Sequence, residues 1–79
     1  MNKQEFTAAL SKNGIDPKIV CFNDKTKDDI FCVMENESCV NVFYRERGRH
    51  FNEFRFNTLS DGLTYLLDYI LKITGKYPV

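Results

Sequence analysis

Three stretches rich in β-branched and aromatic residues follow one another in the middle of the chain, with only short polar breaks between them. They are "IFCVME" (30–35), "CVNVFYRE" (39–46) and "HFNEFRF" (50–56). Such side chains pack well on a pleated surface, and breaks this short connect neighbouring antiparallel strands. A β-sheet is therefore the feature around which the rest of the chain has to fold.

Helix patterns flank these strands. Asn2 is placed to cap a first helix that ends at Gly14, and "TLSDGLTYLLDYILKITG" (58–75) predicts a second. Thr58 or Ser60 can cap the second helix, and Gly75 can close it. Its apolar residues recur every three or four positions, as helix burial requires: Leu59, Leu63, Leu66, Leu67, Ile70 and Leu71.

The sequence as a whole predicts one globular α+β domain over residues 1–79. "KIVCF" (18–22) adds a short first strand, and the charged "NDKTKDD" (23–29) connects it to the next. We expect a two-layer fold, in which an antiparallel meander of about four strands carries the N-terminal and C-terminal helices on one face.

The connections suggest which side chains share a face of the sheet. "ERG" (46–48) fits a three-residue hairpin loop with Gly48 in the left-handed conformation, which would place Phe43 opposite Phe51 and Val40 opposite Phe54. A three-residue "NES" turn (36–38) would likewise place Met34 opposite Val40. The alternation of strand side chains then predicts a helix-covered face made of Ile30, Cys32, Met34, Val40, Val42, Tyr44, Phe54 and Phe56. The opposite face would hold Phe31, Val33, Glu35, Cys39, Asn41, Phe43, Arg45, Phe51, Glu53 and Arg55.

The charge of the chain is balanced but unevenly spread. Eleven basic residues equal eleven acidic ones, so the whole protein should not be drawn to nucleic acid or to a membrane. From 24 to 37, however, five acids oppose two lysines, and from 45 to 55 four arginines oppose two glutamates. We therefore expect two surface patches of opposite sign.

No residue pattern predicts an enzyme, a metal site or a cofactor. The three cysteines, Cys21, Cys32 and Cys39, are an odd number and form no C-x-x-C pair, which favours reduced, partly buried thiols. His50 is the one histidine, and no nucleophile lies beside it in the sequence. The N-terminus lacks the apolar core of a signal peptide, so we expect a cytoplasmic protein. We also expect that it binds neither a membrane nor a small-molecule ligand.

Protein binding and RNA binding remain as the two candidate functions. The order helix, antiparallel strands, helix is also that of a double-stranded RNA-binding domain. Those domains hold phosphates with lysines at the start of the second helix, where this chain has "NTLSDGL" with an aspartate. Aromatic residues interleaved with arginines are equally typical of protein interfaces. Protein binding is the interpretation that we prefer.

The stretch "VFYRERGRHFNEFRFNTLSDGLTYLLDYIL" (42–71) resembles small bacterial immunity proteins that neutralise polymorphic or contact-dependent toxins. The similar features are a strand that ends in Tyr44, the "ERG" turn, a strand that ends in Phe56, and a helix with a leucine and tyrosine stripe. The resemblance implies a non-enzymatic cytosolic protein that binds one toxin domain, for which a basic nuclease is one candidate. The residues expected to contact that partner are Asp24, Asp28, Asp29, Glu37, Phe43, Tyr44, Arg45, Glu46, Arg47, Arg49 and Phe51.

Overall fold

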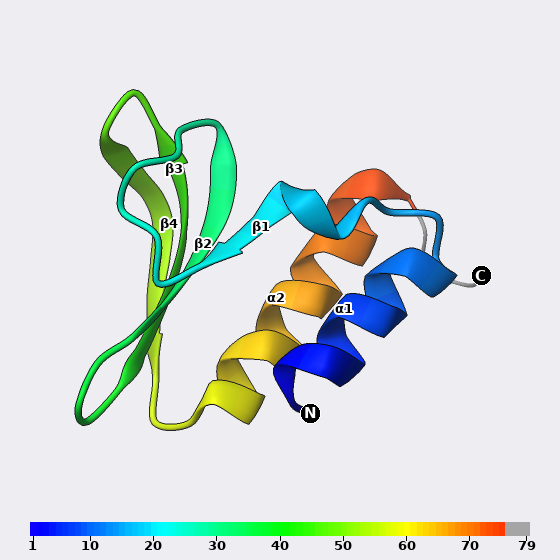
Figure 1. Ribbon diagram of the computed structural model, residues 1–79, viewed down its shortest axis with the longest axis horizontal. Coiled ribbons are helices and arrows are strands. Elements are labelled where there is room, and N and C mark those ends of the chain that lie inside the picture. The colour runs from blue at the N-terminus through cyan, green and yellow to red at the C-terminus, as the bar shows by residue number, and fades with distance from the viewer. Residues whose placement is uncertain (76–79) are drawn as a thin grey trace.

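The computed structural model describes residues 1–75 and has the expected α+β composition, with one helix at each end of a four-stranded sheet (Figure 1). The helices lie side by side on one side of the sheet, and the strands follow the order β1-β2-β3-β4. The helices are α1 (Lys3–Lys12), the short 3₁₀ helix η1 (Pro17–Ile19) and α2 (Leu59–Thr74). The strands are β1 (Val20–Phe22), β2 (Ile30–Glu35), β3 (Val40–Glu46) and β4 (Arg49–Phe56).

Both long helices begin and end where their capping residues are. Asn2 and Glu5 cap α1 reciprocally, because each side chain accepts a hydrogen bond from the other residue's backbone N–H, at 2.8 and 2.9 Å. The Thr58 hydroxyl accepts from the Asp61 N–H at the start of α2, and Gly75 ends that helix with φ 68°. These boundaries confirm the prediction.

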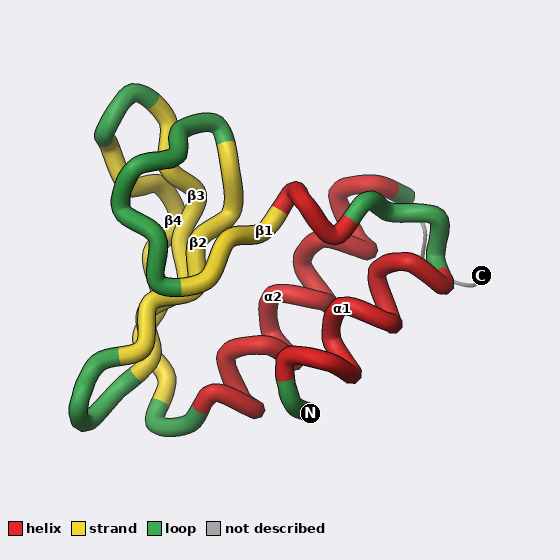
Figure 2. The backbone as a smooth tube through the Cα atoms, viewed as in Figure 1, coloured by secondary structure: helices red, strands yellow, loops and turns green. Residues whose placement is uncertain are grey.

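The first strand departs from the expected meander, because β1 runs parallel to β2. The segment 23–29 therefore has to travel back along the sheet before β2 can start, as the loop between β1 and β2 does in Figure 2. Two residues with positive φ, Asn23 and Asp29 (both 55°), make the reversals at its ends. The sheet is mixed, and only β2, β3 and β4 form an antiparallel meander.

Both hairpin predictions were wrong by one residue. The loop between β3 and β4 consists of Arg47 and Gly48 alone, since Glu46 pairs with Arg49. Their φ values of 51° and 76° are those of a type I′ turn, so only the positive φ predicted for Gly48 is confirmed. The loop between β2 and β3 includes Cys39, whose carbonyl accepts from the Asn36 N–H at 2.8 Å.

These shifts change which residues share a face. β2 is inverted relative to the prediction, so Val33 packs in the core with the helices while Cys32 lies on the opposite face. In β4 an extra residue forms a bulge near Asn52 (φ 53°). The shorter turn and the bulge each shift the register by one residue, so Val40 pairs with Phe56 rather than with Phe54. Ile30 and Met34 join Cys32 on the outer face, and Phe51 pairs with Tyr44 instead of Phe43.

The main core lies between the sheet and the helices, and Gly62 marks its tightest point. Leu63, Leu66 and Ile70 of α2 are at most 1% exposed there, together with Phe6 and Leu10 of α1. A Cβ atom on Gly62 would lie 3.3 Å from methyl groups of both Val40 and Val42. The glycine is what lets α2 lie directly on β3.

We expect Gly62→Val to lower the free energy of unfolding by roughly 1–3 kcal/mol, because its branched side chain overfills this contact. Urea denaturation followed by circular dichroism measures the change. Thr64→Val is the matched control, since it places the same side chain at an exposed position of the same helix. Equal stabilities of the two variants would contradict the close packing of α2 on β3.

Candidate functional site

The segment 23–29 lies across the outer face of the sheet, away from the helices (Figure 1). It is tied down at both ends: the Asn23 N–H donates to the Val33 carbonyl (2.9 Å), and the Asp28 carboxylate accepts from the Gly48 N–H (3.0 Å). The second of these hydrogen bonds joins the segment 23–29 directly to the β3–β4 turn. The segment 23–29 therefore covers part of the outer face of the sheet.

Arg45 fixes the middle of this segment. Its Nη1 donates to the carbonyl oxygens of Asp24 (3.3 Å) and Lys27 (3.2 Å), and the side chain is only 6% exposed. The guanidinium also lies 5.5 Å from the centre of the Phe43 ring. Arg45 is therefore a structural clamp between β3 and the segment 23–29.

Under the segment lies a second, smaller cluster of buried residues. It contains Cys21, Ile30, Cys32 and Phe43, with the half-buried Met34 beside them. The Sγ atoms of Cys21 and Cys32 are 3.4 Å apart on neighbouring strands, and all three cysteines are free thiols. Burial, followed by the contact with Cys21, raises the pKa of the Cys32 thiol to about 12.

A cleft of about 530 Å³ remains open between this segment and β4. Lys25, Thr26 and Asp28 form one wall, and His50 and Glu53 of β4 form the other. The floor consists of side chains from β2 and β3, and Asn36 and Gly48 lie toward opposite ends of those strands. The floor residues are Met34, Asn41, Phe43 and Arg45. The volume of the cleft is within the range of ligand-binding clefts.

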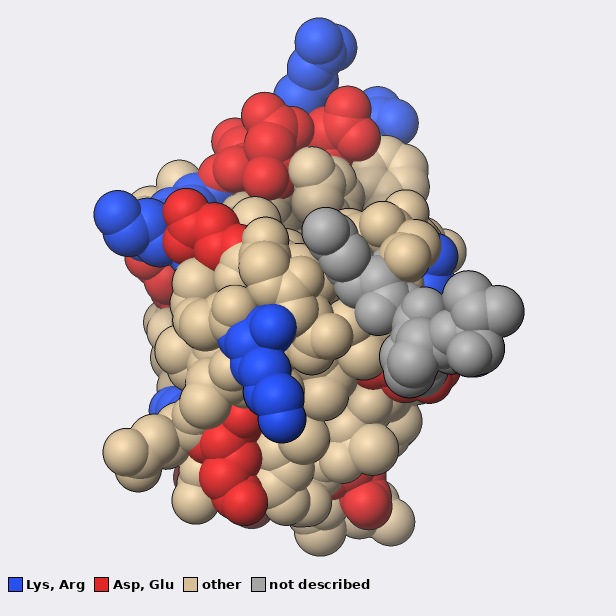
Figure 3. All heavy atoms as spheres, turned by 90° about the vertical axis from the view of Figure 1, so that its right-hand side faces the viewer, with Lys and Arg blue, Asp and Glu red and all other residues tan. Residues whose placement is uncertain are grey.

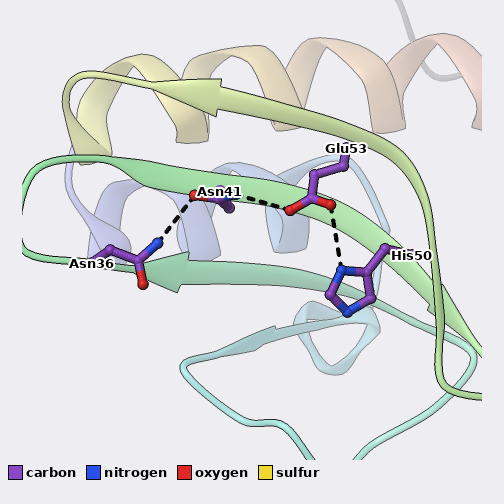
Figure 4. A network of polar contacts seen from close by, with 4 residues as sticks. All are labelled: Asn36, Asn41, His50 and Glu53. Atoms are coloured by element: carbon purple, nitrogen blue, oxygen red, sulfur yellow. Dashed lines mark hydrogen bonds and ion pairs between the residues drawn. The ribbon is translucent and has the colours of Figure 1, made fainter.

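A chain of four polar side chains runs along the β4 side of the cleft (Figure 4). Asn36 donates to the Asn41 Oδ1 (3.1 Å), and Asn41 donates to the Glu53 Oε2 (2.9 Å). The other oxygen of Glu53 lies 3.4 Å from His50 Nδ1. The His50 ring stacks on Phe43, with ring centres 3.8 Å apart. The arrangement brings amide, imidazole and carboxylate groups together beside the cleft.

The strand β4 is the second candidate contact element, because it is an edge of the sheet and nearly all of it is exposed. Phe51 is 44% exposed and Phe54 is 47% exposed, both high values for phenylalanine. Phe54 contacts Tyr65 of α2 (ring centres 5.0 Å apart), and Tyr65 in turn neighbours Tyr69 (6.3 Å). An exposed aromatic surface therefore extends from β4 onto α2.

The structure separates the residues that the sequence grouped as partner contacts. Arg45 and Phe43 are buried (6% and 3% exposed), unlike most of the other predicted contact residues. Glu37 lies in the β2–β3 turn, at the other end of β2 from Asp28, so the acidic residues do not form one patch. The exposed members are Asp28, Asp29, Glu37, Glu46, Arg47, Arg49 and Phe51, whereas Asp24 and Tyr44 are half-buried.

Sequence reasoning missed the cleft wall and most of the aromatic surface. His50 was considered only as a catalytic residue, and Asn36, Asn41 and Tyr69 were not singled out. The exposed Phe54 was assigned to the core. The tyrosines of α2 carried the one available signal, since they stand four positions apart beside the leucine stripe.

Figure 3 shows the side of the molecule that carries the helices. In Figure 3, acidic and basic side chains are interspersed there among larger areas of uncharged atoms. Within residues 1–75 no helix is long and apolar enough to cross a membrane, and no group of three or more His, Cys, Asp or Glu side chains is arranged to hold a metal ion.

No protein-family model matches the chain, and searches of curated proteins and of solved structures found no match either.

The clamp can be tested by removing its charge. We expect Arg45→Met to lower the free energy of unfolding by about 1–3 kcal/mol, because two carbonyl oxygens lose a charged donor. Amide hydrogen exchange in the segment 23–29 should speed up at the same time. Arg55→Met is the control, an exposed arginine of β4 that does not line the cleft. Unchanged exchange in Arg45→Met would show that other contacts hold the segment.

The thiols should react unequally. Only the thiolate attacks a disulfide reagent, so the buried Cys32 with its raised pKa should react at pH 8 at least about tenfold more slowly than the half-buried Cys39. We expect one fast and two slow groups in the native protein, three fast groups in denaturant, and no zinc by elemental analysis. Cys39→Ser, as the control, should remove the fast phase alone. Fast labelling of Cys21 or Cys32 would contradict their burial.

Proposed function

We propose that the protein is a non-catalytic binding module, and specifically an immunity protein that binds and neutralises a toxin domain in the cytoplasm. The observation that carries this proposal is the edge strand β4, which exposes Phe51 and Phe54 between arginines instead of covering them. Aromatic and arginine side chains supply most of the binding energy in protein interfaces. The resemblance of residues 42–71 to immunity proteins supports the same function.

A folded protein domain suits this surface better than a nucleic acid does. The edge of β4 offers backbone groups and aromatic rings together, which is the combination that an added protein strand uses. The arginines on β4 and its turn are accompanied by Glu46 and Glu53, so the local positive field is weak. RNA binding needs several uncompensated cations along a groove. The start of α2, where an RNA-binding domain would carry lysines, has Asp61 in its first turn.

The two functions make different predictions on a heparin or RNA column. A protein-binding module with balanced charge should elute below physiological salt, whereas an RNA-binding domain should be retained with a steep salt dependence. Retention above 0.15 M salt, roughly the physiological ionic strength, would favour the RNA alternative.

The immunity function itself predicts a genetic and physical partner. The gene immediately upstream should encode a large secreted protein with a variable C-terminal domain. Co-expression of that domain with this protein should give a stable complex on size-exclusion chromatography and restore the growth of cells that the domain alone inhibits. A toxic domain that neither binds this protein nor is neutralised by it would overturn the proposal.

Within such a complex, Phe51→Ala and Phe54→Ala should each weaken binding by about tenfold or more, roughly 1.4 kcal/mol, because each removes a large exposed anchor. Surface plasmon resonance with the immobilised domain measures the effect. Gln4→Ala is the control, an exposed side chain on α1, which packs against α2 and η1. If both phenylalanine variants bind as the wild type does, β4 is not the interface.

A further inference from the structure

Arg45 has unused hydrogen-bonding capacity at the floor of the cleft. Nη1 makes both of its hydrogen bonds, and among residues 1–75 no acceptor engages Nε or Nη2. Every buried side-chain nitrogen or oxygen in this part of the chain has a partner, so these two atoms keep contact with solvent. Because Arg45 lines the cleft, the cleft is where that solvent contact lies.

The same guanidinium makes no direct ion pair. None of the ion pairs within 4.0 Å in residues 1–75 includes Arg45, although the residue is only 6% exposed. The nearby Asp24 carboxylate accepts instead from the Thr26 hydroxyl (2.6 Å) and backbone N–H (2.8 Å), and these bonds lower the pKa of Asp24, with smaller contributions from the charges of Lys27 and Arg45. A buried cation without a directly paired anion is costly, and proteins rarely retain one.

We infer that the cleft is a receptor for a carboxylate, supplied by an aspartate or glutamate side chain of the protein partner. The planar guanidinium presents Nε and Nη2 side by side, the geometry in which arginine binds both oxygens of a carboxylate. Lys25 on the cleft wall adds a second cation. This inference rests on the proposed function, since it names the chemistry by which the partner is recognised.

The acidic residues of the cleft do not occupy this position. Asp28 is bound to the Gly48 N–H, and Glu53 is held by Asn41 and lies beside His50. Their negative charges nevertheless oppose an incoming anion, so the cleft should bind a single carboxylate weakly. This binding should become stronger when Glu53 loses its charge.

The position of the cleft favours a protein side chain as the source of the carboxylate. It lies on a sheet surface and extends from the β2–β3 turn toward the β3–β4 turn, so a polypeptide segment can cross it. Its wall is formed by β4, the strand whose opposite face carries Phe51 and Phe54. A partner that holds β4 from both sides would reach Arg45 with one side chain and the phenylalanines with another.

The test uses the isolated protein and two peptides, N-acetyl-Gly-Glu-Gly-amide and its glutamine counterpart. In ¹⁵N–¹H correlation spectra we expect the glutamate peptide to shift the amides of residues 24–28 and 45–53 with saturation in the millimolar range, and the glutamine peptide to leave them unchanged. Arg45→Met should weaken this binding by about tenfold or more, because it removes the bidentate donor. Arg55→Met is the matched control and should bind as the wild type does.

Glu53→Gln keeps the test decisive if Arg45→Met loosens the segment 23–29. Glutamine preserves an acceptor for Asn41 but removes the opposing charge, so the affinity for the glutamate peptide should rise at least about twofold. Equal shifts with both peptides, equal losses in Arg45→Met and Arg55→Met, or no gain in Glu53→Gln would each overturn the inference. Peptide binding without binding of the toxin domain would instead overturn the proposed function alone.

Discussion

The guanidinium of Arg45 connects the parts of this protein that lie outside its main core. It holds the segment 23–29 against β3 through two carbonyl oxygens, and that segment in turn covers the buried cysteines and forms one wall of the cleft. A neutral side chain could fill the same volume more cheaply, because burying a charge opposes folding. The retention of a partly satisfied arginine therefore points to a role beyond holding the loop.

The two sides of the strand β4 carry different kinds of side chain. Toward the helices it carries Phe51 and Phe54, and Phe54 extends the aromatic surface of α2 through its contact with Tyr65. Toward the outer face it carries His50, which stacks on Phe43, and Glu53, which accepts a hydrogen bond from Asn41. One partner could thus meet an apolar surface and a polar cleft across a single strand, and the two would contribute to affinity and to specificity respectively.

The sequence was sufficient to predict the features that depend on local interactions, which are the helix ends and the positions of two strands. The caps at Asn2 and Thr58, the closing Gly75 and the leucine stripe located both helices, and the strand propensities located β2 and β3 to within a residue. The face of β2 was missed because Cys39, which is compatible with a strand, belongs to the turn, and one residue of slip inverts every side chain.

Other features depend on contacts between distant residues and left weaker traces in the sequence. The parallel pairing of β1 and the burial of Arg45 arise from the docking of 23–29, which no local pattern encodes. The positive φ values of Asn23, Asp29 and Asn52 did have a signal, because asparagine and aspartate are the residues that most often adopt positive φ after glycine.

The bulge in β4 also bears on how this protein avoids sticking to itself. A long, flat edge strand with exposed phenylalanines is a template for edge-to-edge aggregation. Here Asn52 and Glu53 together oppose Phe43, which breaks the regular spacing of backbone donors and acceptors halfway along the edge. A second copy cannot continue the ladder across that irregularity without its own matching distortion. The edge can therefore stay uncovered until a strand of suitable shape arrives.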